Sequence, residues 1–139
     1  MIFLDANIFI DHLGKGEYWQ DNYVIFEEIQ KTKGEYFASA LSIVFTHMHF
    51  FKFHNKDSKN ELDELLKGIS IVSLTNECLQ QAMEDLSFDD FEDCVQYYSA
   101  KSAGCQTIIT RNPCDFKSVS DKIEILKPRE FVQKKGLVA

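Results

Sequence analysis

The hydrophobic pattern of the chain alternates between short apolar runs and longer segments with helical periodicity. Short apolar runs bounded by polar residues or glycine predict buried β-strands, and five occur, at residues 1–5, 35–39, 69–73, 106–110 and 123–126. Apolar residues three or four positions apart predict helices, at residues 6–12, 17–34, 41–53, 58–68, 76–86, 89–103 and 128–136. This alternation is typical of right-handed βαβ crossovers and a parallel sheet. We therefore predict a three-layer α/β/α fold with a central, mostly parallel five-stranded sheet.

Local signals sharpen some of these helices. Asp5 or Asn7 can cap the first helix, because both side chains accept hydrogen bonds from free backbone N–H groups. Ser58, followed three residues later by Glu61, matches the pattern of a capping box. The oily segment 41–53 predicts a largely buried helix. No repeat or glycine- and proline-rich linker interrupts the chain, so we expect one continuous domain over residues 1–139.

Composition supports a globular protein and narrows its class. The chain has 139 residues, of which 45% are hydrophobic and 27% charged, which is ordinary for a folded domain. No apolar run approaches the roughly 20 residues of a membrane helix, and the N-terminus lacks the basic region of a signal peptide. We therefore expect a cytoplasmic protein. The four cysteines stand singly, without the spacing of a zinc site, and predict core residues or free thiols.

Net charge restricts how the protein could handle nucleic acid. The formal charge is −7, so no global field attracts a polyanion. Binding one would require a local basic patch, a bound cation or a basic partner chain. The 15 Lys and Arg residues are scattered, with a loose group at Lys52, Lys56 and Lys59.

Acidic and polar residues fall where the predicted strands end. Asp5 ends the first strand, Thr110 and Asp115 follow the fourth, and Asp93 lies in the first turns of the helix that precedes it. Connecting helices run antiparallel to a parallel sheet, so these positions meet at the carboxyl edge of the strands. Hard oxygen ligands in such a place are typical of Mg²⁺ or Mn²⁺. The alternative is that each acid is a helix cap or complements a helix dipole, an effect of about 0.3–1 kcal/mol.

The crowded segment "DDFED" at residues 89–93 contains acids of two kinds. Asp90, Asp93 and Tyr97 fall along one flank of the helix, which points toward the rim. Asp89 and Glu92 form another edge, which we expect to be solvated. The segment therefore contributes two candidate site residues and two residues explained by the dipole or by solvent.

Two motifs together resemble the PIN domain family, including the VapC-like toxins of type II toxin–antitoxin systems. They are "IFLDANIFIDHL" and "DFEDCVQYYSAKSAGCQTIITRNPCDF", and the closing "ILKPREFV" is similar to the family's usual end. Among the acids, the resemblance implies that Asp5 is the first metal-binding aspartate and Asp93 the acid of the later helix. Asp90 corresponds to an extra acid, and Asp115 is the carboxylate nearest to the family's fourth aspartate.

The same resemblance implies roles for three uncharged residues. Asn7 matches a polar residue two positions after the first aspartate, and Thr110 matches the threonine that ends the fourth strand. Asn112 stands where many members carry an aspartate. These side chains would position water or substrate.

One position departs from the family pattern. The family usually has a glutamate in the helix after the second strand, near Phe45, whereas this chain has no acid between Tyr36 and Lys56. His47 and His49 lie on that helix, but imidazole is a poor magnesium ligand, and we interpret both as core or surface residues.

The leading hypothesis implied by the resemblance is a metal-dependent endoribonuclease acting on single-stranded RNA, the toxin of a toxin–antitoxin pair. It would use Mg²⁺ or Mn²⁺, bind a cognate antitoxin protein, and could form a homodimer. The alternative is a catalytically impaired PIN module that binds RNA or protein, suggested by the missing glutamate. A phosphatase or phosphoacceptor centred on Asp5 is disfavoured. The haloacid-dehalogenase-like pattern has a second aspartate two residues after the first, where this chain has Asn7. A receiver domain has a lysine at the end of a late strand, where this chain has Thr110.

Overall fold

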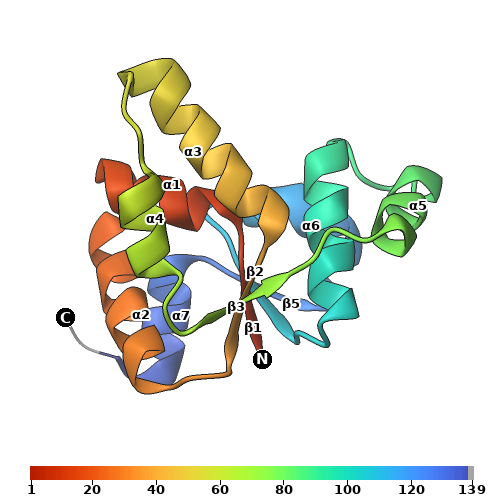
Figure 1. Ribbon diagram of the computed structural model, residues 1–139. Coiled ribbons are helices and arrows are strands. Elements are labelled where there is room, and N and C mark those ends of the chain that lie inside the picture. Colours follow the sequence, from red (N-terminus) through yellow and green to blue (C-terminus); the bar gives the residue numbers. More distant parts are fainter. Residues whose placement is uncertain (138–139) are drawn as a thin grey trace.

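The computed structural model describes residues 1–137 and has a five-stranded sheet at its centre (Figure 1). The strand order is β3-β2-β1-β4-β5, and every pairing between neighbours is parallel. The predicted strands are thus confirmed, and the sheet is wholly rather than mostly parallel. The strands are β1 (Ile2–Leu4), β2 (Tyr36–Ser39), β3 (Ile69–Val72), β4 (Thr107–Ile109) and β5 (Glu124–Leu126).

Helices cover both faces of this sheet, as predicted (Figure 1). On one side, α1 packs against α2 and α3, α2 against α7, and α3 against α4. On the other side, α6 packs against α5 and the 3₁₀ helix η1. The helices are α1 (Ala6–Gly14), α2 (Trp19–Lys31), α3 (Ala40–His54), α4 (Lys59–Leu65), α5 (Asn76–Glu84), α6 (Phe91–Ser102), η1 (Pro113–Val119) and α7 (Pro128–Lys135).

The continuous apolar runs follow from burial on both faces of the sheet. Along β1, Leu4 belongs to the core beneath α1, α2 and α7, whereas its neighbour Phe3 belongs to the core beneath α6 and η1. In β4, Ile109 and Ile108 divide in the same way. A strand buried on both faces cannot show polar–apolar alternation, so the sequence presents it as an uninterrupted hydrophobic run.

Two predicted caps have different outcomes. Asp5 is the N-cap of α1, and its side chain accepts a hydrogen bond from the backbone N–H of Ala6. The capping box at Ser58 is wrong, because the Ser58 side chain makes no cap hydrogen bond. Its hydroxyl instead lies 3.3 Å from Nδ1 of His47, on the neighbouring helix α3. Asp57 accepts a hydrogen bond from the backbone N–H of Lys59 in its place.

The prediction that residues 41–53 form a largely buried helix is also wrong in its burial. The helix α3 is present, but only Ser42, Thr46 and Phe50 are buried along it. It projects beyond the sheet, with one side against α1 and α4 (Figure 1). Four large apolar side chains along it are exposed to between 55% and 64%, namely Val44, Met48, Phe51 and Phe53.

Two further expectations concern membranes and cysteines. Within residues 1–137, no helix has the length and apolar character needed to cross a bilayer. All four cysteines are free thiols, as predicted; three are buried, and Cys114 is exposed.

Candidate functional site

The carboxyl ends of three neighbouring strands bring the first site residues together. In the pairing of β1 with β4, Leu4 lies opposite Ile109, and the backbone N–H of Asp5 donates to the carbonyl of Ile109 at 3.0 Å. The next residues, Asp5 and Thr110, are therefore adjacent. Ser39 ends β2 on the other side of β1. This is the sheet edge at which ligands of parallel α/β folds usually bind.

Four donors fix the Asp5 carboxylate, which is 5% exposed. Its Oδ1 accepts from the backbone N–H of Ala6 at 2.8 Å and from Nε2 of Gln96 at 3.2 Å. Its Oδ2 accepts from the Thr110 hydroxyl at 2.8 Å and from Nδ2 of Asn7 at 3.3 Å. Burial raises the pKa of Asp5, while hydrogen bonds from Thr110, Gln96 and Ala6 oppose that rise. The predicted partners Asn7 and Thr110 thus contact Asp5 directly.

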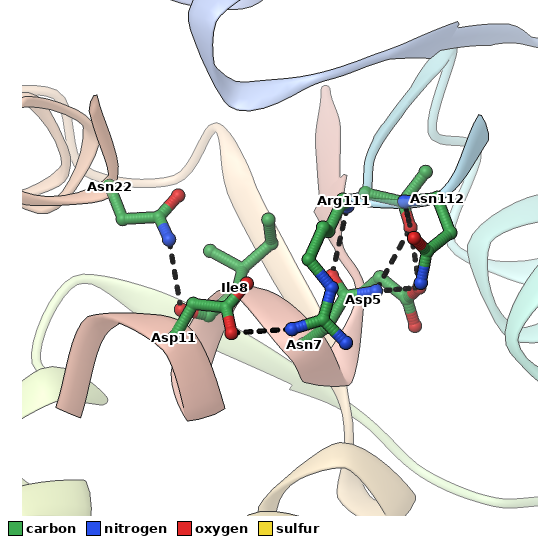
Figure 2. Close-up of polar contacts among 8 residues, drawn as sticks. Asp5, Asn7, Ile8, Asp11, Asn22, Arg111 and Asn112 are labelled. Carbon is green, nitrogen blue, oxygen red and sulfur yellow. Dashed lines mark hydrogen bonds and ion pairs between the residues drawn. The ribbon is translucent and has the colours of Figure 1, made fainter. Parts of the chain in front are cut away.

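The loop after β4 is tied to α1 beside this carboxylate (Figure 2). The backbone N–H of Arg111 donates to Oδ1 of Asn7 at 3.1 Å, and the backbone N–H of Asn112 donates to the Thr110 hydroxyl at 3.2 Å. The Arg111 side chain reaches across to the buried Asp11, with 2.6 Å between Nη1 and Oδ1. Asn112 therefore contributes its backbone to the site network, and its side chain is exposed.

The acids of α6 and η1 lie within electrostatic reach of Asp5. Partial burial raises the pKa of Asp93 to about 7, reinforced by the charges of Asp5, Asp90, Asp115 and Glu92. The charge of Asp115 also raises the pKa of Asp5. Such mutual repulsion is the electrostatic condition that a bound cation relieves. The donor set consists of carboxylate and hydroxyl oxygens, which fit a hard divalent ion.

These acids stand apart from one another in the structure. Within residues 1–137, no three Asp, Glu, His or Cys side chains form a group that could hold a metal ion. One of the acids has a structural role, because Asp90 is the N-cap of α6 and its Oδ1 accepts from the backbone N–H of Asp93 at 3.2 Å. The helix-cap alternative therefore accounts for Asp90.

Two residues of α6, Tyr97 and Glu92, have surroundings that the sequence pattern did not predict. Tyr97, expected on the same flank as the acids, is 4% exposed and packs in the core beneath η1. Glu92 is exposed, as expected, yet it lines a groove next to the site. Although the side chain is exposed, desolvation by the neighbouring atoms raises the pKa of Glu92, and the charges of Asp90 and Asp5 raise it further.

That groove has a volume of about 700 Å³ and runs along the exposed side of α3. Phe45, the residue near which the family glutamate was expected, is part of its wall together with Glu92. The other lining residues are Ile10, His47, Met48, His49, Phe51, Lys52 and Phe53. An apolar groove thus borders the start of α6 through Glu92.

The loose basic group near this helix is partly neutralised. Lys56 lies 3.5 Å from Glu61, and Lys59 lies 3.5 Å from Asp57. Lys52 lines the groove itself. Two of the three lysines therefore have acidic partners, which weakens the case for a large basic patch here.

The sequence reasoning missed three buried polar residues beside Asp5. Gln96, Ser39 and Ser42 are at most 1% exposed and are joined by hydrogen bonds. The available signal was a glutamine in the middle of the apolar stretch "CVQYY", since a buried amide requires hydrogen-bond partners.

Fold and sequence together define the class of the protein. The sequence profile of the PIN domain matches residues 1–113, so the chain belongs to the PIN domain family. Among curated proteins, it is similar to "Ribonuclease VapC1" of Aquifex aeolicus (strain VF5), with 24% identity over 139 residues that cover 96% of this chain and 94% of the relative.

Solved structures have the same fold. A toxin–antitoxin complex from Klebsiella pneumoniae superposes with a TM-score of 0.66 at 16% identity, covering 92% of this chain and 98% of the other. VapC20 of Mycobacterium tuberculosis, described as a sarcin–ricin loop cleaving toxin, superposes with a TM-score of 0.61 at 12% identity. That alignment covers 78% of this chain and 87% of the other. At these identities the likeness establishes the fold alone.

Proposed function

We propose that this PIN domain, which we take to span residues 1–139, is a metal-dependent endoribonuclease that hydrolyses phosphodiester bonds of single-stranded RNA. The observation that carries the proposal is the Asp5 carboxylate, fixed by four donors at the carboxyl end of β1 and within electrostatic reach of Asp93, whose pKa is raised to about 7 by burial and by the neighbouring acids. Membership of the PIN domain family and the similarity to a VapC ribonuclease support the same reaction.

Asp5, Asp93 and Asp115, whose side chains stand apart in the structure, would have to draw together to hold one Mg²⁺ or Mn²⁺, with Asp90 as a neighbouring acid. When bound, such an ion polarises a phosphodiester oxygen and lowers the pKa of a coordinated water. The residues of the chain do the remaining work. Thr110 and Asn7 keep Oδ2 of Asp5 in one orientation, and a carboxylate of the site accepts the proton of the attacking water.

The direct test is cleavage of a fluorescent single-stranded RNA by the purified protein in Mn²⁺, in Mg²⁺ and in EDTA. We expect cleavage with either ion and none in EDTA. Asp5→Asn and Asp93→Asn should each abolish cleavage, whereas Asp89→Asn, a change in the same acidic segment, should leave it intact. Cleavage that survives both site substitutions would show that a contaminant or another site is responsible.

A second function follows from the α3 side of the site, where Phe45 and an acid-free helix face the groove. A PIN module without nuclease activity would bind RNA or protein there. It would show no divalent-dependent cleavage and no rise in melting temperature with Mn²⁺. A thermal titration with Mn²⁺ therefore separates the two functions.

We infer that the protein is the toxin of a toxin–antitoxin pair and that its antitoxin binds along the groove. Exposed apolar patches of this kind are typical of protein interaction sites, and Glu92 places an acid on the groove wall. An antitoxin segment with apolar side chains for the face of α3 and a basic side chain for the acids fits both features. A homodimer through α3 is the competing use of this surface.

Expression in cells tests the toxin. Induction of this gene alone should arrest growth, and Asp5→Ala should remove the arrest. We expect the antitoxin gene to lie next to this one, and its co-expression should prevent the arrest. Phe51→Glu should weaken antitoxin capture without changing RNA cleavage. If Phe51→Glu instead converts a dimer into a monomer in light scattering and leaves antitoxin binding intact, the groove is the dimer interface.

A further inference from the structure

A closed ring of hydrogen bonds lies directly behind Asp5. Gln96 projects from α6, one turn after Asp93, and is 1% exposed. Its Nε2 donates to Oδ1 of Asp5 at 3.2 Å and to the Ser42 hydroxyl at 2.6 Å. Its Oε1 accepts from the Ser39 hydroxyl. The two serine hydroxyls lie 3.2 Å apart, so one amide joins β1, the start of α3 and α6.

The direction of every hydrogen bond in this ring is determined by the chemistry of its members. An ionised Asp5 can only accept, so the NH₂ group of Gln96 must face it. The Ser39 proton goes to Oε1 of Gln96, so the Ser42 hydroxyl donates to Ser39. The Ser39 oxygen also accepts from the backbone N–H of Ser42 at 3.1 Å. Both N–H groups and the oxygen of the amide are thereby satisfied, and reversing the amide would leave Asp5 facing an oxygen.

The ring joins Asp5 to the start of α3 through Ser39 and Ser42. Here α3 contributes hydroxyl groups at its first turn and no acid along its length. A third carboxylate packed against Asp5 would add repulsion, whereas the Gln96 amide donates a hydrogen bond that favours the ionised carboxylate. The amide therefore supports the charge of Asp5 without adding negative charge to the site.

We propose that Gln96 is a positioning residue: its amide, anchored by Ser39 and Ser42, holds the Asp5 carboxylate in the orientation that binds the divalent ion. The inference rests on the proposed function, and it concerns the orientation of Asp5 rather than the acid missing from α3. Hydrogen-bonding partners behind a metal ligand typically change metal affinity or activity by about 10- to 100-fold.

The test compares three variants with the wild type by calorimetric titration with Mn²⁺ and by steady-state cleavage of a single-stranded RNA. Gln96→Met removes the amide and keeps a side chain of similar length. Ser42→Ala keeps the amide and removes one of its anchors. Asn22→Leu is the matched control, because Asn22 is a fully buried amide on α2 that donates to the carbonyl of Ile8.

We expect Gln96→Met to raise the Kd for Mn²⁺ by about tenfold or more and to lower kcat with little change in KM for RNA. Ser42→Ala should change both in the same direction by a smaller factor. Asn22→Leu should lower the melting temperature and leave the Kd and kcat unchanged. If Gln96→Met does not fold, Ser42→Ala decides the matter in the same way.

An unchanged Kd and kcat in the Gln96 and Ser42 variants, with only the melting temperature lowered, would overturn the inference and reduce Gln96 to a structural residue. In that case wild-type cleavage and its loss in Asp5→Asn would still stand, so the proposed nuclease would be unaffected. If the wild type itself binds no Mn²⁺ and cleaves no RNA, both the nuclease and the role of Gln96 are overturned.

Discussion

The repulsion among the acids around Asp93 makes the metal-free protein less stable than it could be. Asp93→Asn removes the charge and keeps the shape of the side chain. A pKa of about 7 in place of the ordinary 3.8 corresponds to about 4 kcal/mol between the two protonation states. Because Asp93 is partly exposed, solvent screening reduces this to about 1–2 kcal/mol. Loss of a negative charge in the first turn of α6 offsets about 0.5 kcal/mol of that gain.

The sign of the pH dependence follows from the direction of the shift. The folded protein holds the Asp93 proton more tightly than the unfolded chain does. Below about pH 4 Asp93 is neutral in both states, and its bound proton makes its full contribution to the stability of the fold. That contribution is lost as the pH rises through about 7. In EDTA at pH 8, Asp93→Asn should therefore be more stable than the wild type by about 1 kcal/mol, or about 3–5 °C in melting temperature. At pH 5 the difference should disappear or reverse.

The assay is thermal or urea unfolding of both proteins at pH 5 and pH 8, in EDTA and in Mn²⁺. Saturating Mn²⁺ should reverse the order at pH 8, because a ligand that binds only the folded state raises its stability and the variant has lost a ligand. Asp89→Asn, in the same segment, should show neither effect. The reasoning is refuted if Asp93→Asn is less stable than the wild type in EDTA at pH 8, or if Mn²⁺ stabilises both proteins equally.

Two other contacts give predictions of different kinds. Arg111→Met should destabilise the protein by about 2–4 kcal/mol, because it leaves the carboxylate of Asp11, which is 5% exposed, buried without its cation. The double variant with Asp11→Asn should recover most of that loss in urea unfolding; an additive double variant would show that the pair is not coupled. Glu92→Gln should alter Mn²⁺ affinity and RNA cleavage measurably, since Glu92 shares the field of Asp5, whereas Asp89→Asn should not. If these two variants behave identically, Glu92 is a solvated surface residue with no role in the site.

The sequence predicted the centre of the sheet well because β1 and β4 are buried on both faces. Short continuous apolar runs such as "IFL" and "TII" are typical of such strands. The parallel register of β1 and β4 then places Asp5 beside Thr110. The same logic failed for α3. Its residues are apolar nearly all round, and periodicity does not distinguish an apolar side covered by the protein from one left exposed.

The network behind Asp5 was beyond sequence reasoning for a different reason. Gln96 lies within an apolar stretch, and its partners Ser39 and Ser42 are more than fifty residues away in the sequence. Only the pairing of β1 with β2 and the packing of α6 bring the three together. Glu92 is exposed, as expected. Its place beside a groove was missed because that groove is formed mainly by α3, which is distant in the sequence.

The measurement closest to the central claim is cleavage of single-stranded RNA by wild type and Asp5→Asn, each titrated with Mn²⁺ from an EDTA-treated state. Wild-type cleavage should rise with Mn²⁺ and saturate, whereas Asp5→Asn should stay folded but inactive at every Mn²⁺ concentration. Cleavage by wild type in EDTA, or equal cleavage by Asp5→Asn, would contradict the central claim.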